Sequence, residues 1–226
     1  MKMKYIGYIQ NDFPEKFGLP RQSGLAPDLL SKVIMEESFR IPEAFRGIEA
    51  FSHLWLLWEF EPVGSPDESF SPTVRPPKLG GNERVGVFAS RSPNRPNRIG
   101  MTLVKLICIE TDPSLGPVLT VSGGDMKDGT RILDIKPYLP YADCVPDANG
   151  AFAAKLADHR IPVVWETPIP SSLDTEGKLA LEEVLALDPR PGYQQDPTRI
   201  YKMSYRKWTV SFRIDDWVHI VQMEET

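Results

Sequence analysis

The sequence predicts a mainly β protein, a barrel or a sandwich, followed by a small α+β unit. The chain has 226 residues and 22 prolines, and each proline removes an amide donor and fixes φ, which suits sheets joined by rigid loops better than helix bundles. Short apolar segments follow one another at close spacing, with few helical patterns between them. A strong helical periodicity occurs only after residue 147. We therefore expect the α+β unit to begin at about residue 148.

Most elements expected in the first 147 residues are short strands, because these segments are rich in β-branched and aromatic residues. Strands are expected at 3–10, 31–39, 53–60, 85–89, 102–111, 118–122 and 132–135. Segment 31–39 also fits a helix, but its Val and Ile content favours a strand. A short helix is expected at 42–48, since Pro42 suits its start and Gly47 its end. The Asp128-Gly129 pair predicts a hairpin turn between the last two strands.

Two rigid loops interrupt these strands, and the C-terminal unit mixes one helix with strands. The loop at 61–83 carries five prolines, and a loop of this length in a compact domain is usually functional or disordered. The second loop is 91–100. In the C-terminal unit we expect a helix at 173–187, a loop at 188–196 and strands at 200–205, 209–214 and 217–221.

The cysteines and the apolar segments indicate a soluble, cytoplasmic protein. Cys108 and Cys144 are far apart and resemble neither a disulfide framework nor a zinc site, which fits a reducing compartment. The N-terminus lacks the apolar stretch of a signal peptide. The longest apolar run, 54–58, is too short to span a bilayer. We therefore expect no membrane association.

Positive charge is concentrated in one segment of an acidic chain. The net charge is −5, but residues 75–105 hold seven cations against the single acid Glu83, so the segment is +6 and the remainder −11. Phosphate contacts depend on local charge density, so such a segment is able to bind a polyanion. Scattered, solvated arginines explain the same charges equally well.

Several common site motifs are absent from the sequence. No Gly-rich dinucleotide or phosphate loop occurs in a strand–loop–helix context. The histidines and cysteines lack metal-ligand spacing, and no nucleophile elbow surrounds a serine. These absences argue against a Rossmann cofactor site, a nucleotidase, a metalloenzyme and a triad hydrolase.

The loop at 91–100 is the strongest candidate for a binding segment. It places Arg91, Arg95 and Arg98 between prolines and asparagines, so the arginines are held with little ordering cost on binding. The planar guanidinium group suits a carboxylate or a phosphate. The alternative is a purely structural loop.

Several motifs, taken in their order along the chain, resemble the TsaA-like domain. They are RPPKLGG at 75–81, GVFASRSPNRPN at 86–97, DGT at 128–130 and DIKPY at 134–138. A further motif, DPRPGY at 188–193, is similar to the C-terminal motif of the TrmO branch. The resemblance covers residues 1–147 and, less fully, the tail.

The resemblance implies a fold, a cofactor and an activity. The fold is a single-sheeted β-barrel over residues 1–147 with a small C-terminal α+β domain over 148–226, usually in a homodimer. The cofactor is S-adenosylmethionine, with no metal. Members methylate N6 of threonylcarbamoyladenosine next to the anticodon of tRNAs that read threonine codons. Two other functions stay open: a regulatory module that binds the cofactor without catalysis, and a methyltransferase for a substrate other than tRNA.

The family motifs also imply site residues. The implied cofactor contacts are Pro20, Arg21, Gln22, Glu61, Pro62, Arg91, Leu103, Asp128, Gly129, Thr130 and Arg131. The candidate tRNA contacts are Arg75, Lys78, Arg84, Arg95 and Arg98. This chain departs from the family pattern at three places. Glu61-Pro62 stands where the family has a His-Gln type pair, and Arg98 and Arg131 stand where proline is usual. Asp128, Tyr138 and Glu61 are alternative candidates for a general base, and the sequence does not choose among them.

Overall fold

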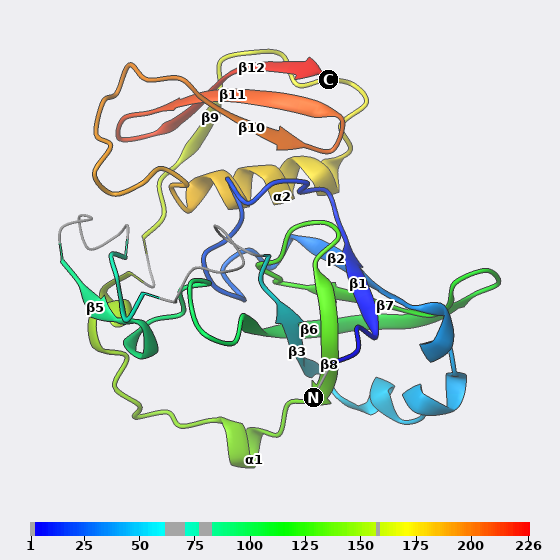
Figure 1. The fold of residues 1–226 in the computed structure, drawn as a ribbon. Coiled ribbons are helices and arrows are strands. Elements are labelled where there is room, and N and C mark those ends of the chain that lie inside the picture. The colour runs from blue at the N-terminus through cyan, green and yellow to red at the C-terminus, as the bar shows by residue number, and fades with distance from the viewer. Residues whose placement is uncertain (1–2, 62–70, 77–82, 157–158) are drawn as a thin grey trace.

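Six antiparallel strands close into a barrel in the order β1-β2-β7-β6-β3-β8 (Figure 1). The computed structural model describes residues 3–61, 71–76, 83–156 and 159–226. The barrel strands are β1 (Gly7–Gln10), β2 (Leu30–Met35), β3 (His53–Glu59), β6 (Ile99–Asp112), β7 (Gly116–Ser122) and β8 (Arg131–Pro137). The predicted single-sheeted barrel is therefore confirmed.

Alternating side chains of the strands fill the barrel. In β3, Leu54, Leu56 and Trp58 are buried, while the residues between them are partly exposed, because successive side chains of a strand point to opposite faces. Strand β6 has 14 residues and pairs with both β3 and β7. Strand β6 therefore links β3 on one side to β7 on the other within the barrel wall.

Some predicted elements before residue 90 are wrong in type. The expected helix at 42–48 is a pair of 3-10 helices, η2 (Pro42–Phe45) and η3 (Ile48–Ala50), because Gly47 lies between them with a φ of +87°. The strand expected at 31–39 ends at Met35, and η1 (Glu37–Phe39) follows.

The loop at 61–83 and the strand at 85–89 also differ from expectation. The loop contains β4 (Thr73–Val74), which pairs with β5 (Val85–Gly86). The 3-10 helix η5 (Val87–Ala89) follows β5. A two-residue strand is too short to leave a periodic sequence pattern.

The Asp128-Gly129 pair forms a turn, but the expected hairpin is wrong. Strand β7 pairs with β2 and β6, whereas β8 pairs with β1 and β3. Barrel closure thus separates two strands that are neighbours in the sequence. The turn is instead held by β1, since Gly129 donates to the Ile9 carbonyl at 2.8 Å. Gly129 has a φ of +74°, a conformation that favours glycine.

The C-terminal unit is a four-stranded sheet covered by a helix on its barrel side (Figure 1). Its elements are β9 (Val163–Trp165), α2 (Thr175–Ala186), β10 (Tyr201–Tyr205), β11 (Trp208–Ile214) and β12 (Val218–Glu225). Two short helical elements precede it, α1 (Pro140–Asp143) and η6 (Ala151–Leu156). Helix α2 begins after Asp174, whose side chain accepts a hydrogen bond from the Gly177 amide at 2.6 Å.

The segment between β1 and β2 connects the barrel to the C-terminal unit. The structure has two hydrophobic cores, one inside the barrel and one between α2 and the C-terminal sheet. Phe13, Ala26 and Leu29 belong to the second core, although they lie between two barrel strands in the sequence. Residues 20–22 are therefore held beside both units. Within the described ranges, no helix is long and apolar enough to cross a membrane.

Candidate functional site

A cleft of about 480 Å³ opens at the end of the barrel where β3 ends and β8 begins. Strands β3 and β8 pair there through Trp58 and Ile132. Pairing brings the residues after β3 next to those before β8. Six implied cofactor contacts line this cleft: Pro20, Arg21, Glu61, Gly129, Thr130 and Arg131.

Two acids of the cleft wall are paired with cations or a phenol. Glu61 forms ion pairs with Lys127 at 2.6 Å and Lys16 at 3.2 Å. The hydrogen bond from Lys127 is the main cause that lowers the pKa of Glu61. Glu59 accepts a hydrogen bond from the Tyr5 hydroxyl and lies 3.5 Å from Arg98. Both glutamates therefore already have partners within the cleft wall.

Asp125 is a third acid of the cleft, and the sequence did not single it out. Its Oδ1 accepts a hydrogen bond from the Thr102 hydroxyl at 2.6 Å, and Thr102 Oγ1 accepts one from Trp58 Nε1 at 2.8 Å. Burial raises the pKa of the Asp125 carboxyl, although Thr102 and the charge of Arg91 oppose this. The only available signal was its position, directly after Gly123-Gly124 at the end of a strand and shortly before the DGT motif.

A second cleft, of about 850 Å³, adjoins the first at Pro93, which lines both. Arg91 and Gln22, two further implied cofactor contacts, lie in its wall, and Arg91 donates a hydrogen bond to the Gln22 side chain. Arg75 and the exposed ring of Phe88 line it too. Arginines and an exposed ring are groups that bind phosphates and bases.

The DPRPGY motif fixes Arg21 of the first cleft. The Arg21 guanidinium donates to the Arg190 carbonyl at 2.9 Å and to the Pro189 carbonyl at 3.4 Å. Arg190 in turn pairs with Asp188 at 3.0 Å and donates to the Ile214 carbonyl at 3.1 Å. The C-terminal unit therefore contributes to the site by orienting an arginine of the N-terminal segment.

Three proposed site residues do not line either cleft. Leu103 is on the outer face of the barrel, opposite Trp55 on β3. The Asp128 carboxylate is exposed and accepts from the Asn11 amide at 3.0 Å. The Tyr138 ring lies 6.2 Å from that of His53, at the end of β3 opposite the cleft. Pro62 and Lys78 fall outside the described residues.

The remaining candidate tRNA contacts lie in or beside the clefts. Arg98 lines the first cleft and Arg75 the second. Arg84 donates to the Thr73 hydroxyl at 2.8 Å and Arg95 to the Ser90 carbonyl at 3.4 Å. Neither Arg84 nor Arg95 forms an ion pair with any residue that the structure describes. Their charges are therefore available to an anionic ligand.

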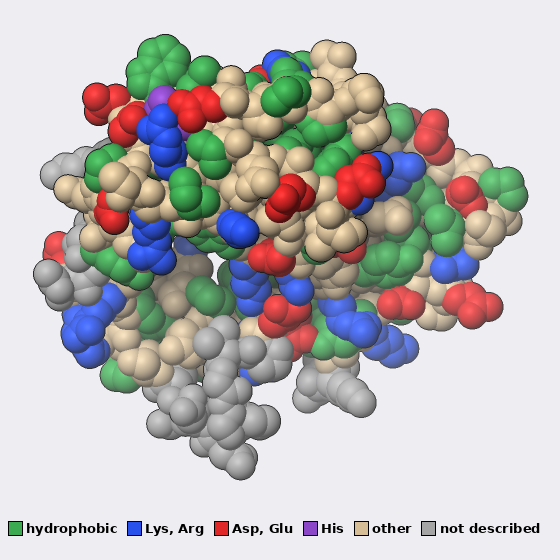
Figure 2. All heavy atoms as spheres, turned by 90° about the horizontal axis from the view of Figure 1, so that it is seen from above, with side chains coloured by type: hydrophobic (Ala, Val, Ile, Leu, Met, Phe, Trp, Pro, Cys, Tyr) green, Lys and Arg blue, Asp and Glu red, His purple; other side chains and the backbone are tan. Residues whose placement is uncertain are grey.

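Several cations of the C-terminal unit are paired within the protein. Arg206 pairs with Asp12 and Asp174, and Lys207 pairs with Glu225. Figure 2, which views the molecule from above the C-terminal sheet, shows acidic and basic side chains interspersed over this face. The positive charges of Arg206 and Lys207 are therefore neutralised within the protein and contribute little to binding an anionic ligand.

The closed six-stranded barrel, its mixed-charge cleft and the adjoining arginine loop define the class as a TsaA-like β-barrel with a C-terminal α+β unit. Residues 8–144 match the tRNA-methyltransferase O N-terminal domain, and residues 159–225 match the TrmO C-terminal domain. The chain therefore belongs to the tRNA-methyltransferase O family.

Individual relatives agree with this assignment over most of the chain. The tRNA (adenine(37)-N6)-methyltransferase of Escherichia coli K12 is 38% identical over 226 residues, covering 95% of this chain and 94% of the relative. The enzyme of the same name from Eikenella corrodens is 44% identical over 174 residues, covering 76% and 96%. A crystal structure of TrmO from Pseudomonas aeruginosa superposes with a TM-score of 0.78 at 33% identity, covering 99% of this chain and 98% of that one.

Proposed function

We propose that the protein is a tRNA methyltransferase that uses S-adenosylmethionine to methylate N6 of N6-threonylcarbamoyladenosine next to the anticodon. The observation that carries this proposal is the first cleft, where six residues implied as cofactor contacts converge from three separate chain segments. The names of the relatives from Escherichia coli and Eikenella corrodens support the same reaction.

The residues of the first cleft fit S-adenosylmethionine, which when bound supplies a methyl group on a sulfonium centre. Trp58 and Phe60, whose ring centroids are 4.2 Å apart, provide an apolar and aromatic wall. Arg98 Nε is buried and has no hydrogen-bond partner among the described residues. A buried donor without a partner is costly, so an anionic group such as the cofactor carboxylate would satisfy it.

Most of the protein's contribution is positioning. Methyl transfer requires the attacking nitrogen, the methyl carbon and the sulfur nearly in line, and such alignment is worth up to about 7–11 kcal/mol. The Arg21 and Arg98 side chains would hold the donor, while Arg75 and Arg95 would hold the tRNA backbone. The two adjoining clefts would place the methyl donor and the substrate adenosine side by side.

The experiment that tests the function is methyl transfer from labelled S-adenosylmethionine to purified tRNA. We expect label on tRNA that carries the threonylcarbamoyl group and none on tRNA that lacks it. Tight donor binding without label on any tRNA would instead favour the regulatory module. Label on a protein or small molecule, with none on tRNA, would favour another substrate.

We also propose that the protein acts as a homodimer through an apolar strip on the outer face of the barrel. Ile99, Met101 and Ile107 of β6 are exposed there. Leu103 lies on the same strand and outer face, so a dimer over this strip would place it near the other copy. Light scattering would show twice the monomer mass, and a Met101→Glu variant should lower it.

The remaining proposals concern domains, location and metal. A division into 1–147 and 148–226 is supported by the two hydrophobic cores and by the two family matches.

A cytoplasmic location fits two exposed free cysteines and a tRNA substrate. Direct methyl transfer between two bound substrates needs no metal, so a chelator should leave the rate unchanged.

A further inference from the structure

We propose that Asp125 is the general base of the methyl transfer, accepting the N6 proton of the substrate adenosine. This inference rests on the proposed function and names the residue that performs one step of it. It differs from the candidates that the sequence offered. The Asp128 side chain does not line the cleft and accepts from the Asn11 amide, Tyr138 lies at the opposite end of β3, and Glu61 is paired with two lysines.

The position of Asp125 is fixed by the barrel interior. Trp58 Nε1 donates to Thr102 Oγ1, and the Thr102 hydroxyl donates to Asp125 Oδ1. Thr102 is fully buried and Trp58 is 8% exposed. The chain of two hydrogen bonds therefore ties the carboxylate to rigid strands β3 and β6, while the residue itself lines the cleft. A base held on rigid elements keeps the geometry that proton transfer needs.

Asp125 differs from the other two acids of the cleft because it has no cation as a direct partner among the described residues. Glu61 is paired with Lys127 and Lys16, which lowers its pKa and makes it a poorer proton acceptor. The Glu59 carboxylate is already engaged by the Tyr5 hydroxyl and lies 3.5 Å from Arg98. Among the described residues, no cation lies within ion-pair distance of Asp125. The charged groups that share its surroundings are Lys16, Arg21, Glu59, Glu61, Arg91, Arg98, Lys127 and Arg131. Burial raises the pKa of Asp125 and outweighs the hydrogen bond from Thr102 and the charge of Arg91, which lower it.

The reaction needs such a base because the attacking nitrogen belongs to a urea-like group, whose lone pair is delocalised. When its N–H bond breaks, the proton passes to the Asp125 carboxylate. The electron pair on nitrogen then forms the bond to the methyl carbon. The electrons of the methyl–sulfur bond stay on sulfur, which leaves as a neutral thioether. The proton on Asp125 returns to water through the open cleft.

The test compares Asp125→Asn with Asp112→Asn. Asparagine keeps an oxygen that accepts from Thr102, so the fold and donor binding, measured by calorimetry, should be retained. We expect kcat to fall about 10²–10⁴-fold and the acid limb of the pH–rate profile to disappear. Asp112 lies at the distant β6–β7 turn, so its variant should match the wild type in rate and pH profile.

A second readout needs no catalysis. Protonation of Asp125 changes the hydrogen bond from Thr102 and, through it, the indole N–H of Trp58. In the ¹H–¹⁵N spectrum of the wild type without ligands, the Trp58 indole signal should move with pH. In Asp125→Asn that movement should be lost.

Each contrary outcome identifies what fails. Active wild-type protein with an unchanged Asp125→Asn rate or acid limb would overturn the general base alone. Loss of donor binding in Asp125→Asn would overturn it too, because the residue would then hold the donor. A wild-type protein that labels no tRNA would overturn the proposed function together with this role.

Discussion

A Cβ atom on Gly177 would lie 2.7 Å from Cζ of Arg206. Gly177 is in the first turn of α2, and Arg206 is in the turn between β10 and β11 with a φ of +51°. Arg206 pairs with Asp12 at 2.8 Å and with Asp174 at 2.9 Å. The guanidinium group therefore joins the N-terminal segment, the helix cap and the C-terminal hairpin, and it leaves no room for a side chain at residue 177.

This relationship predicts that Gly177→Ala destabilises the protein. In an exposed helix the same change usually stabilises by about 1 kcal/mol. Here the new methyl group displaces a guanidinium held by two carboxylates, so we expect a loss of about 1–3 kcal/mol. Urea unfolding would measure it. Gly86→Ala is the matched control, because Gly86 has a φ of −58° and a Cβ there meets nothing within 4 Å. Equal or greater stability in Gly177→Ala would contradict the steric argument.

A second prediction concerns the Thr102 hydroxyl. Its hydrogen bond lowers the pKa of Asp125 and opposes the effect of burial. Thr102→Val removes it, so the pKa of Asp125 rises and the acid limb of the pH–rate profile should move to higher pH. The variant also leaves Trp58 Nε1 without its acceptor, at a cost of about 1–3 kcal/mol. Thr102→Ser keeps the hydroxyl and should preserve both properties. Identical profiles for the valine and serine variants would refute the coupling.

The sequence predicted strands better than it predicted their order. The alternation of buried and partly exposed side chains in β3 follows directly from burial inside a barrel. The pairing of β8 with β1 and β3 depends on barrel closure, which no local pattern encodes. Strand β9 has only three residues and pairs in parallel with β12, so it was missed.

The candidate site was likewise predictable where it depends on local motifs and not where it depends on contacts between distant segments. Family motifs located the segments of the first cleft, because glycines, prolines and arginines at fixed positions are visible in the sequence. They did not reveal Asp125, whose carboxylate accepts a hydrogen bond from Thr102, 23 residues earlier in the sequence on β6. Nor did they reveal that Arg21 is anchored by carbonyls of the DPRPGY motif. Such contacts arise only when the two units pack together.

A third prediction concerns tRNA binding by the loop at 91–100. Arg95 has no ion pair among the described residues, and its guanidinium donates to the carbonyl of Ser90, a residue that lines the second cleft. Charge reversal in Arg95→Glu should weaken tRNA binding and reduce the salt slope of log Kd by about one phosphate contact or more. Filter binding at several salt concentrations would measure it. Lys136→Glu, an exposed change on β8, is the control and should leave the slope unchanged. A slope equal to wild type in Arg95→Glu would remove this residue from the footprint.

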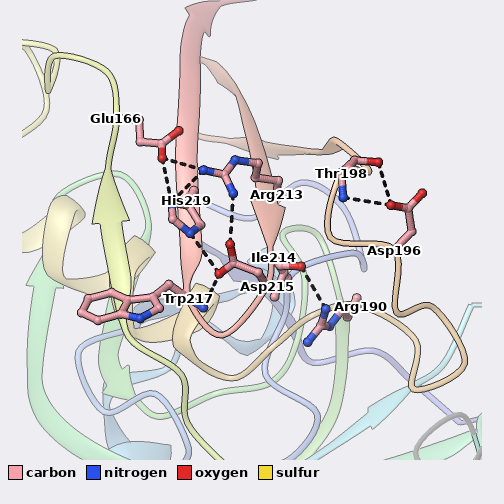
Figure 3. Close-up of polar contacts among 9 residues, drawn as sticks. All are labelled: Glu166, Arg190, Asp196, Thr198, Arg213, Ile214, Asp215, Trp217 and His219. Carbon is pink, nitrogen blue, oxygen red and sulfur yellow. Dashed lines mark hydrogen bonds and ion pairs between the residues drawn. The ribbon is translucent and has the colours of Figure 1, made fainter.

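The final prediction concerns acid stability and a polar cluster of the C-terminal sheet (Figure 3). Asp215 accepts hydrogen bonds from the Trp217 amide at 2.8 Å and from His219 Nε2 at 3.0 Å, and it pairs with Arg213 at 3.1 Å. The backbone hydrogen bond from Trp217 is the main cause that lowers the pKa of Asp215. The folded-state pKa thus lies below the unfolded value of about 3.9.

A depressed carboxyl pKa stabilises the fold above the unfolded pKa, and this stabilisation is lost as pH falls through the folded value. Asp215→Asn should therefore be less stable than wild type at pH 7, and the difference should narrow below about pH 4. Thermal unfolding from pH 7 to pH 3 would follow it. Asp216→Asn is the matched control, because Asp216 is exposed and makes no side-chain hydrogen bond or ion pair among the described residues. A stability difference for Asp215→Asn that stays constant over this pH range would show that the carboxylate charge contributes nothing, and that only its hydrogen-bond geometry matters.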